Sequence, residues 1–213
     1  TSTIAWPNTI LNTIIAESLD YIATQLDSSL AGSSSLEQRD TVVQTVLKDI
    51  LSKHRRVVFD GDNYSTQWHE EAAARGLPNL KSAPDAFPAL VTQKALGLFN
   101  HYGVLSNREL QAREEVLLEQ YSTIVSIEAR TLIMILSTKV LPAALRYQGE
   151  LASIVSTSKA NSIECSRSAA RLGDVGRLSE SLQESIETLQ VSTFKEHENS
   201  LGHAGYIRDS LIP

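Results

Sequence analysis

The amino-acid sequence predicts an all-α protein, and three observations support this prediction. Apolar residues recur at spacings of three and four over several long segments, which is the period of a helix with one buried face. Ten glycines, six prolines and 6% aromatic residues in 213 positions are too few for an ordinary all-β chain. Val57-Val58-Phe59 is the one short run with the β-branched and aromatic character of a strand. We therefore expect an antiparallel helical bundle with a long kinked helical hairpin and at most one short strand or extended connector.

The first two helices are predicted from their apolar stripes and from a capping signal between them. The first helix follows Pro7 and ends in a serine-rich loop at residues 28–34. Its apolar stripe is formed by Leu11, Ile15, Leu19, Ile22 and Leu26. Ser35 and Gln38 make a capping-box pattern that opens the second helix. The expected buried stripe of that helix is Val43, Val46, Leu47, Ile50 and Leu51.

A connector with turn chemistry at residues 57–63 leads into two shorter helices. Ser65 is expected to cap the first of them, and Gly76 to end it. After an irregular stretch, Asp85 is expected to cap the second, which ends at Gly103.

The longest helix is predicted to begin at a second capping box, formed by Ser106 and Glu109, and to meet no strong breaker before Pro142. Its stripe consists of Leu110, Leu117, Ile124, Ile127, Leu132, Ile135 and Leu141. Pro142 lacks a backbone donor, so we expect the helix to bend there and to continue to about Ala170. A chain that folds back at Pro142 is the alternative that stays open.

The end of the chain is predicted to supply the second arm of the hairpin and one last helical segment. A break is expected at Gly173-Asp174-Val175-Gly176. Near-heptad spacing then predicts a partner helix through Leu178, Leu182, Ser185, Ile186 and Leu189. After a polar stretch to Asn199, a final segment carries Leu201, Tyr206, Ile207 and Leu211. No natural cap closes it before Pro213, which suggests that a further helix follows in the natural protein.

Charge and cysteine content narrow the classes of function. The net charge of −6 and the isoelectric point near 5.4 argue against a nucleic-acid or anionic-membrane surface, since either needs a clustered basic face. Cys165 is the only cysteine, so an intrachain disulfide or a thiolate metal cluster cannot form from this chain. The sequence has no uninterrupted run of about 18 apolar residues, and its start does not look like a signal peptide. We expect a soluble, cytoplasmic protein.

Two stretches resemble the beginning of a metal site. His69-Glu70-Glu71 opens like the zinc motif of metalloproteases, but that motif needs a second histidine four residues after the first, and position 73 is alanine. A solvated helix face is the favoured interpretation. Asp60, Asp62 and Asn63 could begin a calcium loop, but the two residues that follow break its alternating oxygen ligands. A plain turn is favoured there.

Three other groups of residues are candidates for binding or catalysis, and each also has a structural interpretation. His54-Arg55-Arg56 could hold a phosphate or a carboxylate, but basic residues at a helix end also complement its dipole, and this structural role is the favoured interpretation. His197 and His203 are six residues apart and so lie on different faces of a helix. Cys165 has no histidine near it in sequence and is interpreted as a small buried residue. The residues themselves therefore assign no catalytic, cofactor-binding or metal-binding side chain to this chain.

Several ordered stretches together resemble the C-terminal region of type III glutamine synthetases. They are Pro7 to Ser18; His54 to Ser65 with Trp68; Gly76 to Lys81; Pro84 to Ala86; Glu119 to Tyr121; Ile127 to Thr131; Leu141 to Ala143; and Tyr206 to Pro213. In that family the first stretch follows an active-site strand, the central ones form an extension, and those from Glu119 to Ala143 lie in a long C-terminal helix. Residues 149–198 carry little of the resemblance.

The resemblance implies an ATP-dependent ligase of nitrogen metabolism, which joins glutamate and ammonia through a γ-glutamyl phosphate. Mg²⁺ or Mn²⁺ would neutralise the phosphate charge in the full-length enzyme. The family's catalytic, nucleotide-binding and metal-binding residues lie before Thr1, so this fragment is expected to hold no cofactor and to be inactive alone. Residues 1–30 would be the last helix of the catalytic domain. Residues 31–213 would be a C-terminal helical domain, truncated before its last segment.

The expected partners follow from the same resemblance. They are the remainder of the catalytic domain and the neighbouring subunits of a homo-oligomer, a dodecamer of two stacked hexameric rings, with no nucleic acid and no membrane. An independent helical protein-interaction module without enzymatic activity is the alternative, and it would expose no extended apolar face. A small enzyme in its own right is the third possibility, for which the sequence offers no set of catalytic residues.

Overall fold

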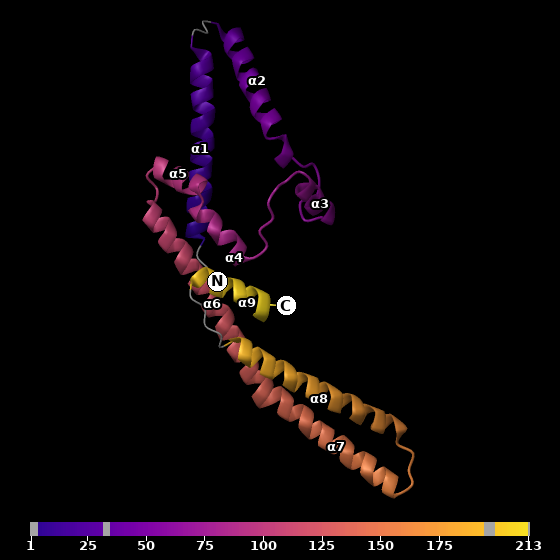
Figure 1. The fold of residues 1–213 in the computed structure, drawn as a ribbon. Helices are drawn as coiled ribbons and strands as arrows, with labels where there is room; N and C mark the ends of the chain where they lie inside the picture. Colours follow the sequence, from indigo (N-terminus) through magenta and orange to yellow (C-terminus); the bar gives the residue numbers. More distant parts are fainter. Residues whose placement is uncertain (1–3, 32–34, 194–198, 213) are drawn as a thin grey trace. The chain divides into compact units, whose positions relative to one another are not determined.

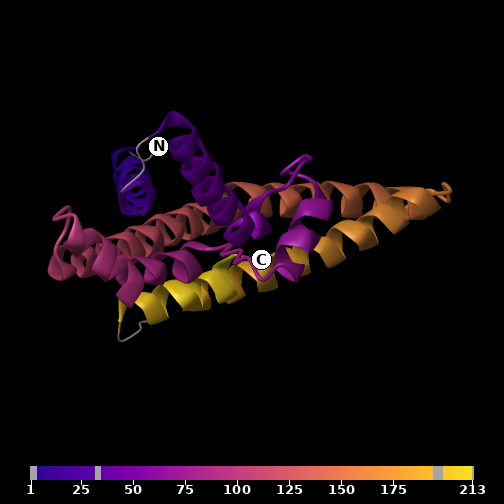
Figure 2. The same cartoon turned by 90° about the horizontal axis from the view of Figure 1, so that it is seen from above.

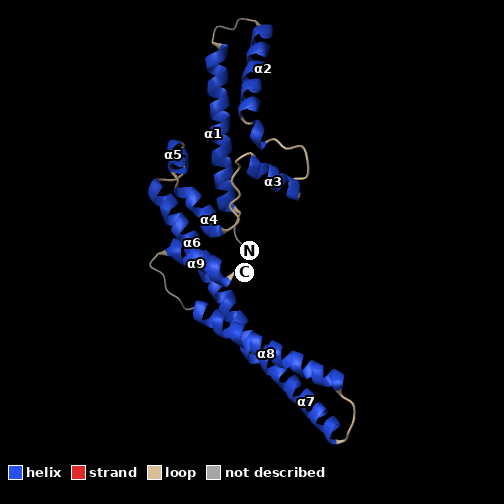
Figure 3. Ribbon diagram, turned by 45° about the vertical axis from the view of Figure 1, so that its right-hand side comes forward, coloured by secondary structure: helices blue, strands red, loops and turns tan. Residues whose placement is uncertain are grey.

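The computed structural model describes residues 4–31, 35–193 and 199–212, and within these ranges it contains helices and loops but no strand (Figure 3). The all-α prediction is confirmed. Val57 ends a short 3₁₀ helix, η1 (Arg55–Val57), and an irregular connector follows it. None of the helices in the described ranges is long and apolar enough to span a membrane. The chain divides into two compact units, Thr1–Lys81 with Pro88–Ala112 and Ser82–Phe87 with Arg113–Pro213, which we describe separately.

The first unit begins with a helical hairpin of α1 (Ala5–Leu30) and α2 (Leu36–Lys53) (Figure 1). The predicted capping box of α2 is confirmed: the Gln38 amide donates to Ser35 Oγ at 3.3 Å, and the Ser35 amide donates to Gln38 Oε1 at 3.4 Å. Helix α1 runs further than predicted and includes Ser28, whose hydroxyl donates to the Thr24 carbonyl at 2.8 Å. The serine therefore satisfies its own donor inside the helix instead of ending it.

Helix α3 (Thr66–Ala74) starts and stops where the sequence predicts. Ser65 Oγ accepts the Trp68 amide at 3.3 Å, and Gly76 follows the helix at a positive φ of 69°. Gly103 likewise follows α5 (Gln93–His101) at a φ of 61°. Glycine adopts this left-handed conformation without steric cost, which is why it ends both helices.

The prediction of a single helix between Asp85 and Gly103 is wrong. The structure has α4 (Ala83–Ala86), a 3₁₀ helix η2 (Phe87–Val91) and α5 instead. Ser82, not Asp85, caps α4, and Thr92 Oγ1 caps α5 by accepting the Ala95 amide at 3.3 Å. Pro88 lacks the amide that would continue the hydrogen bonds of α4, and Thr92 offers a fresh cap four residues later.

A small apolar cluster holds the first unit together where α1, α5 and the first turn of α6 (Asn107–Ile135) meet. Phe99 and Leu110 are almost wholly buried, and Leu96 lies beside them. Trp6 stacks on Phe99 with ring centroids 6.2 Å apart. Ile10 and Leu105 complete the cluster. The capping box at the start of α6 is confirmed, because Ser106 and Glu109 exchange both hydrogen bonds.

The long helix crosses Pro142 without folding back. Helix α6 passes into a π-helical turn, η3 (Leu136–Val140), and then into α7 (Leu141–Ala160). Within the π turn the Leu141 amide donates to the Leu136 carbonyl, five residues earlier. The irregularity thus precedes Pro142, whose missing amide would have bonded to Thr138 in a regular helix.

In the second unit, α8 (Ser166–Thr193) packs along α7, as Figures 1 and 2 show from two sides. The antiparallel hairpin is confirmed, but its turn lies at residues 161–165 and not at the predicted break, 173–176. Ser162 takes a positive φ of 60°, and the Ile163 amide closes the end of α7 on the Ser158 carbonyl at 2.9 Å. Leu151, Val155 and Ile186 are buried in the hairpin.

Gly173 and Gly176, which were expected to interrupt the helix, lie inside α8. At Gly176 an added Cβ would lie 3.4 Å from Nε2 of Gln148 on α7, which is an ordinary van der Waals contact, so packing does not require glycine there. Gly173 meets no such neighbour, and its place in the helix is unexplained by packing.

Helix α9 (Ser200–Leu211) closes the second unit against α4 and α8. Asn199 caps it by accepting the Gly202 amide at 2.7 Å. Ala204 and Ile207 are buried, and Arg208 pairs with Asp85 of α4 at 2.6 Å. The predicted helical segment at the end of the chain is therefore present.

Candidate functional site

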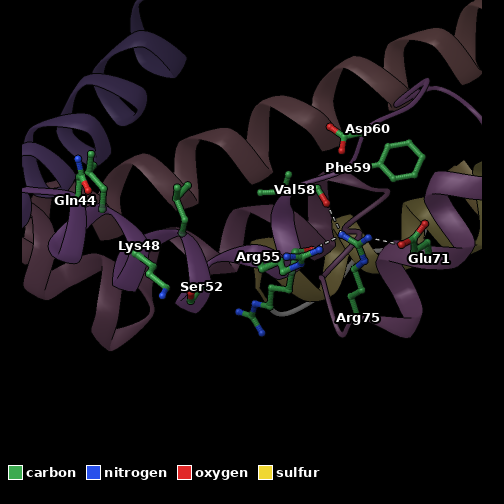
Figure 4. A pocket seen from close by; sticks show the side chains of 12 residues that line it. Gln44, Lys48, Ser52, Arg55, Val58, Phe59, Asp60, Glu71 and Arg75 are labelled. Carbon is green, nitrogen blue, oxygen red and sulfur yellow. Dashed lines mark hydrogen bonds and ion pairs between the residues drawn. The ribbon is translucent and has the colours of Figure 1, made fainter.

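A groove of about 1080 Å³ lies in the first unit, between α2 on one side and the connector and α3 on the other. Figure 4 shows Gln44, Lys48 and Ser52 following one another along α2, opposite the connector residues Val58 and Asp60. The groove includes Arg55 and Arg56, two of the three basic residues that the sequence singled out. We treat this groove as the candidate functional site.

Arg75 fixes the wall of the groove that faces α2. Its Nη1 donates to the carbonyls of Arg56 at 3.0 Å and Val58 at 2.7 Å, and its Nη2 pairs with Glu71 one turn earlier in α3 (Figure 4). The guanidinium carbon also lies 5.6 Å from the centre of the Trp68 ring. A guanidinium presents several donors in one plane, so a single side chain can tie the connector to α3.

An aromatic contact and a glycine complete that wall. The rings of Phe59 and Trp68 lie 4.6 Å apart. An added Cβ on Gly61 would come within 2.7 Å of Phe59 Cε1, so any larger residue there would have to displace this ring. The connector is therefore held by packing and by hydrogen bonds rather than by a sheet.

The inner surface of the groove combines exposed apolar side chains with cations. Leu47, Leu51 and Val58 are 48%, 64% and 50% exposed. Lys48, Arg55 and Arg56 also line the groove, and none of them forms an ion pair within the described part of the chain. Such a surface can bury apolar groups and attract carboxylates at the same time.

The other residues that the sequence offers as candidate metal ligands or nucleophiles lie in ordinary structural positions. His69 and Glu70 are exposed on α3, as a solvated helix face requires. Asp62 Oδ1 accepts the Tyr64 amide at 2.9 Å, which makes residues 60–64 a turn. Cys165 is half-buried, with its Sγ 4.0 Å from the Val155 carbonyl oxygen.

The structure brings none of these candidates into a metal site. Among the described residues, no group of three or more His, Cys, Asp or Glu side chains is placed to hold a metal ion. His203 lies half-buried in α9, and His197 lies outside the described residues. His54 follows the end of α2, where its amide donates to the Ile50 carbonyl at 3.0 Å.

The role of Trp68, Glu71 and Arg75 in the groove wall is not predicted from the sequence. The spacing of Glu71 and Arg75, four residues apart on a short helix, was the available signal for their ion pair. Nothing in the sequence indicates that the same arginine reaches carbonyls 17 and 19 residues earlier.

Elsewhere in the first unit, Tyr102 ties the end of α5 to α1. Its hydroxyl donates to Asp20 Oδ2 at 2.9 Å. Burial raises the pKa of Tyr102 above its ordinary value of 10.0, and the hydrogen bond to Asp20 raises it further. The folded chain therefore favours the neutral phenol, so this stabilising effect is complete below about pH 10 and is lost as the pH rises through the folded-state pKa.

We expect the pKa of Tyr102 to lie above the ordinary value of 10.0 for tyrosine. The difference in absorbance at 295 nm between the wild type and Tyr102→Phe, followed as a function of pH, should rise above pH 10. The melting temperature of Tyr102→Phe should also fall less steeply over that range. A difference curve with its midpoint at or below pH 10 would contradict this assignment.

Several helices leave large apolar side chains exposed. They include Leu11, Ile15 and Leu19 on α1 and Ile124, Leu132 and Ile135 on α6. These helices therefore present faces suited to burial against other protein.

The fold defines an all-α helical protein with exposed apolar helix faces, and sequence comparison identifies its family. Residues 42–159 match the family described as "Glutamine synthetase C-terminal domain". The chain belongs to this family. It corresponds to the C-terminal region of the type III enzymes, in agreement with the resemblance seen in the sequence.

Three curated relatives support the assignment. The chain is 41% identical to a type-3 glutamine synthetase from Dictyostelium discoideum over 152 residues, which are 71% of this chain and 20% of that protein. It is 36% identical to a glutamine synthetase from Butyrivibrio fibrisolvens, over 59% of this chain and 18% of that protein. It is 31% identical to a glutamine synthetase from Bacteroides fragilis, over 61% of this chain and 18% of that protein. The chain thus spans about a fifth of the length of the relatives it matches.

Proposed function

We propose that this chain is the C-terminal helical part of an ATP-dependent ligase that makes glutamine from glutamate and ammonia. Residues 1–30 would then be the last helix of the catalytic domain, and residues 31–213 a C-terminal helical domain. In this proposal the chain supplies no catalytic residue, and ATP and Mg²⁺ or Mn²⁺ bind to the rest of a cytoplasmic enzyme. Its role is to pack against the catalytic core and neighbouring subunits of a homo-oligomer, a dodecamer in the type III class.

The observation that supports this role best is the uncovered apolar surface. Helix α1 has a single buried residue, Thr13, and α2 has none. Leu11, Ile15 and Leu19 are each more than half exposed along one face of α1. Burying such side chains contributes about 1.5–3 kcal/mol each, so a chain that leaves a row of them in water is suited to a partner. An independent module would be expected to cover them.

The size of the native polypeptide tests the proposal directly. An antibody raised against this chain should detect a band several times larger than 23.3 kDa in the source cells. The large polypeptide, purified, should form glutamine from glutamate, ammonia and ATP, and this chain alone should not. A native band at 23.3 kDa would favour the independent interaction module.

Acidic substitutions on the exposed face of α6 test the assembly role. We expect Ile124→Asp with Leu132→Asp to dissociate the native oligomer, because both side chains are about half exposed here and a buried, unpaired carboxylate is costly. Sedimentation of the full-length polypeptide measures the effect. Ser153→Asp, an exposed polar position on α7, is the matched control. An intact oligomer in the double variant would exclude an interface at this face.

A further inference from the structure

We propose that the groove between α2, the connector and α3 is a docking site for an acidic segment of a partner protein that also carries apolar side chains. This inference goes beyond the ligase proposal and does not depend on it. It rests on three properties of the groove: uncovered apolar walls, an unneutralised set of cations, and a wall that is already fixed in place.

The apolar walls of the groove would allow such a segment to bury its own apolar side chains. Leu47 and Leu51 are four residues apart on one face of α2, and Val58 lies in the connector across the groove. All three are about half exposed or more. Val43, Val46 and Ile50 lie beside the two leucines on the same apolar stripe and are half-buried, and α2 packs against α1 in the hairpin. The apolar stripe of α2 is therefore wide, and the edge that carries Leu47 and Leu51 is left exposed.

The charges in the groove select an acidic partner. Lys48, Arg55 and Arg56 contribute three cations without an ion pair in the described structure. Of the two acidic residues in the lining, Glu71 is already paired with Arg75, which leaves Asp60. The groove is thus locally positive on a chain whose net charge is −6. Carboxylates are complementary to this set, whereas a free phosphate would leave the apolar walls uncovered.

The fixed wall lowers the entropic cost of binding. Arg75 holds the connector at the Arg56 and Val58 carbonyls, and the Phe59–Trp68 contact supports the connector from behind. The backbone from Arg56 to Val58 is therefore positioned before a partner arrives. A preorganised surface loses less conformational freedom on binding than a mobile loop.

Fluorescence anisotropy on the native full-length polypeptide tests the proposal. The probe is a labelled amphipathic peptide with leucines at helical spacing and glutamates on both flanks. The first control replaces every glutamate with lysine, and the second scrambles the order of the residues. We expect saturable binding of the acidic peptide alone, and weaker binding as salt is raised from about 0.05 to 0.5 M.

Two variants should each weaken binding of the acidic peptide at least tenfold. They are the charge reversal Lys48→Glu/Arg55→Glu/Arg56→Glu and the apolar change Leu47→Ser/Leu51→Ser. All five side chains are exposed, so circular dichroism should show both variants folded. A matched reversal on exposed residues of the second unit, Lys139→Glu/Arg146→Glu, should leave binding unchanged.

Three outcomes would overturn the docking site. One is equal binding of the acidic and basic peptides, and another is binding that survives the charge reversal. The third is no peptide binding together with an oligomer that falls apart when the three cations are reversed, since the groove would then be covered by a neighbouring subunit. A native band at 23.3 kDa would refute the ligase proposal and leave this experiment unchanged.

Discussion

Replacing Leu110 by alanine is expected to lower the free energy of unfolding of the first unit by about 3 kcal/mol. Leu110 is fully buried, and it contacts the cluster in which Leu96, Phe99 and Trp6 meet. Truncation removes three carbon atoms from this cluster and leaves a cavity. Few other buried apolar side chains are available in this unit to compensate, so the loss should be large relative to the total stability.

The fluorescence of Trp6 reports on this change, because its ring stacks on Phe99 in the same cluster. The chain has two tryptophans, so urea unfolding is best followed in a Trp68→Phe background. Leu51→Ala is the matched control, since Leu51 lies in the same unit with 64% of its surface exposed. Equal shifts of the unfolding midpoint in the two variants would show that the cluster is not the core of this unit.

Replacing Arg75 by methionine is expected to release the connector from α3. The change removes two hydrogen bonds to carbonyls and one ion pair while keeping an unbranched side chain beside Trp68. Hydrogen bonds from a charged donor contribute about 1.5–3 kcal/mol, so the free energy of local opening should fall by about that amount. Native-state hydrogen exchange at the Val57 and Val58 amides, which bond to the carbonyls of His54 and Arg55, measures it.

Arg56→Met is the control for this experiment. Its side chain is exposed and lies on the same connector, so it should leave the exchange of both amides unchanged. Arg75→Lys should give an intermediate result, because an ammonium can reach one carbonyl but cannot reproduce the planar set of donors. Protection that is retained in Arg75→Met would mean that the Phe59–Trp68 contact alone holds the connector.

The sequence predicts best those features that depend on a few neighbouring residues. The capping boxes at Ser35 and Ser106 and the glycine stops at Gly76 and Gly103 are all present. Each is a local event, in which one side chain or one backbone angle decides where the helix begins or ends. These signals do not depend on tertiary contacts, so they can be recognised in the sequence alone.

The position of the hairpin turn was predicted wrongly. Gly173 and Gly176 look like a break, but the turn of the hairpin lies at 161–165, where Ser162 adopts the left-handed conformation. Both glycines lie inside α8, where α8 packs along α7. Packing of this kind depends on the register of α7 against α8, which the local sequence does not reveal.

Helical periodicity also overstated how much of each stripe is buried. Leu11, Ile15 and Leu19 have the spacing of a core-facing stripe on α1, yet the structure leaves them exposed. Periodicity shows which face a helix can bury, and not whether the covering partner belongs to the same chain. The groove is not predicted for a related reason: Arg55 and Arg56 are recognisable as a basic pair, but the wall depends on Arg75, almost 20 residues later.

The π turn at Leu136–Val140 has a geometric consequence for the surfaces of the long helix. Such a turn accommodates one more residue than an α-turn, and one residue corresponds to a rotation of about 100° about the helix axis. A stripe that follows Ile124 and Ile135 on α6 is therefore out of phase with the side chains of α7. Removing a single residue such as Thr138 would restore the regular α-helical phase, so this one position sets how far the side chains of α7 are turned about the helix axis from those of α6.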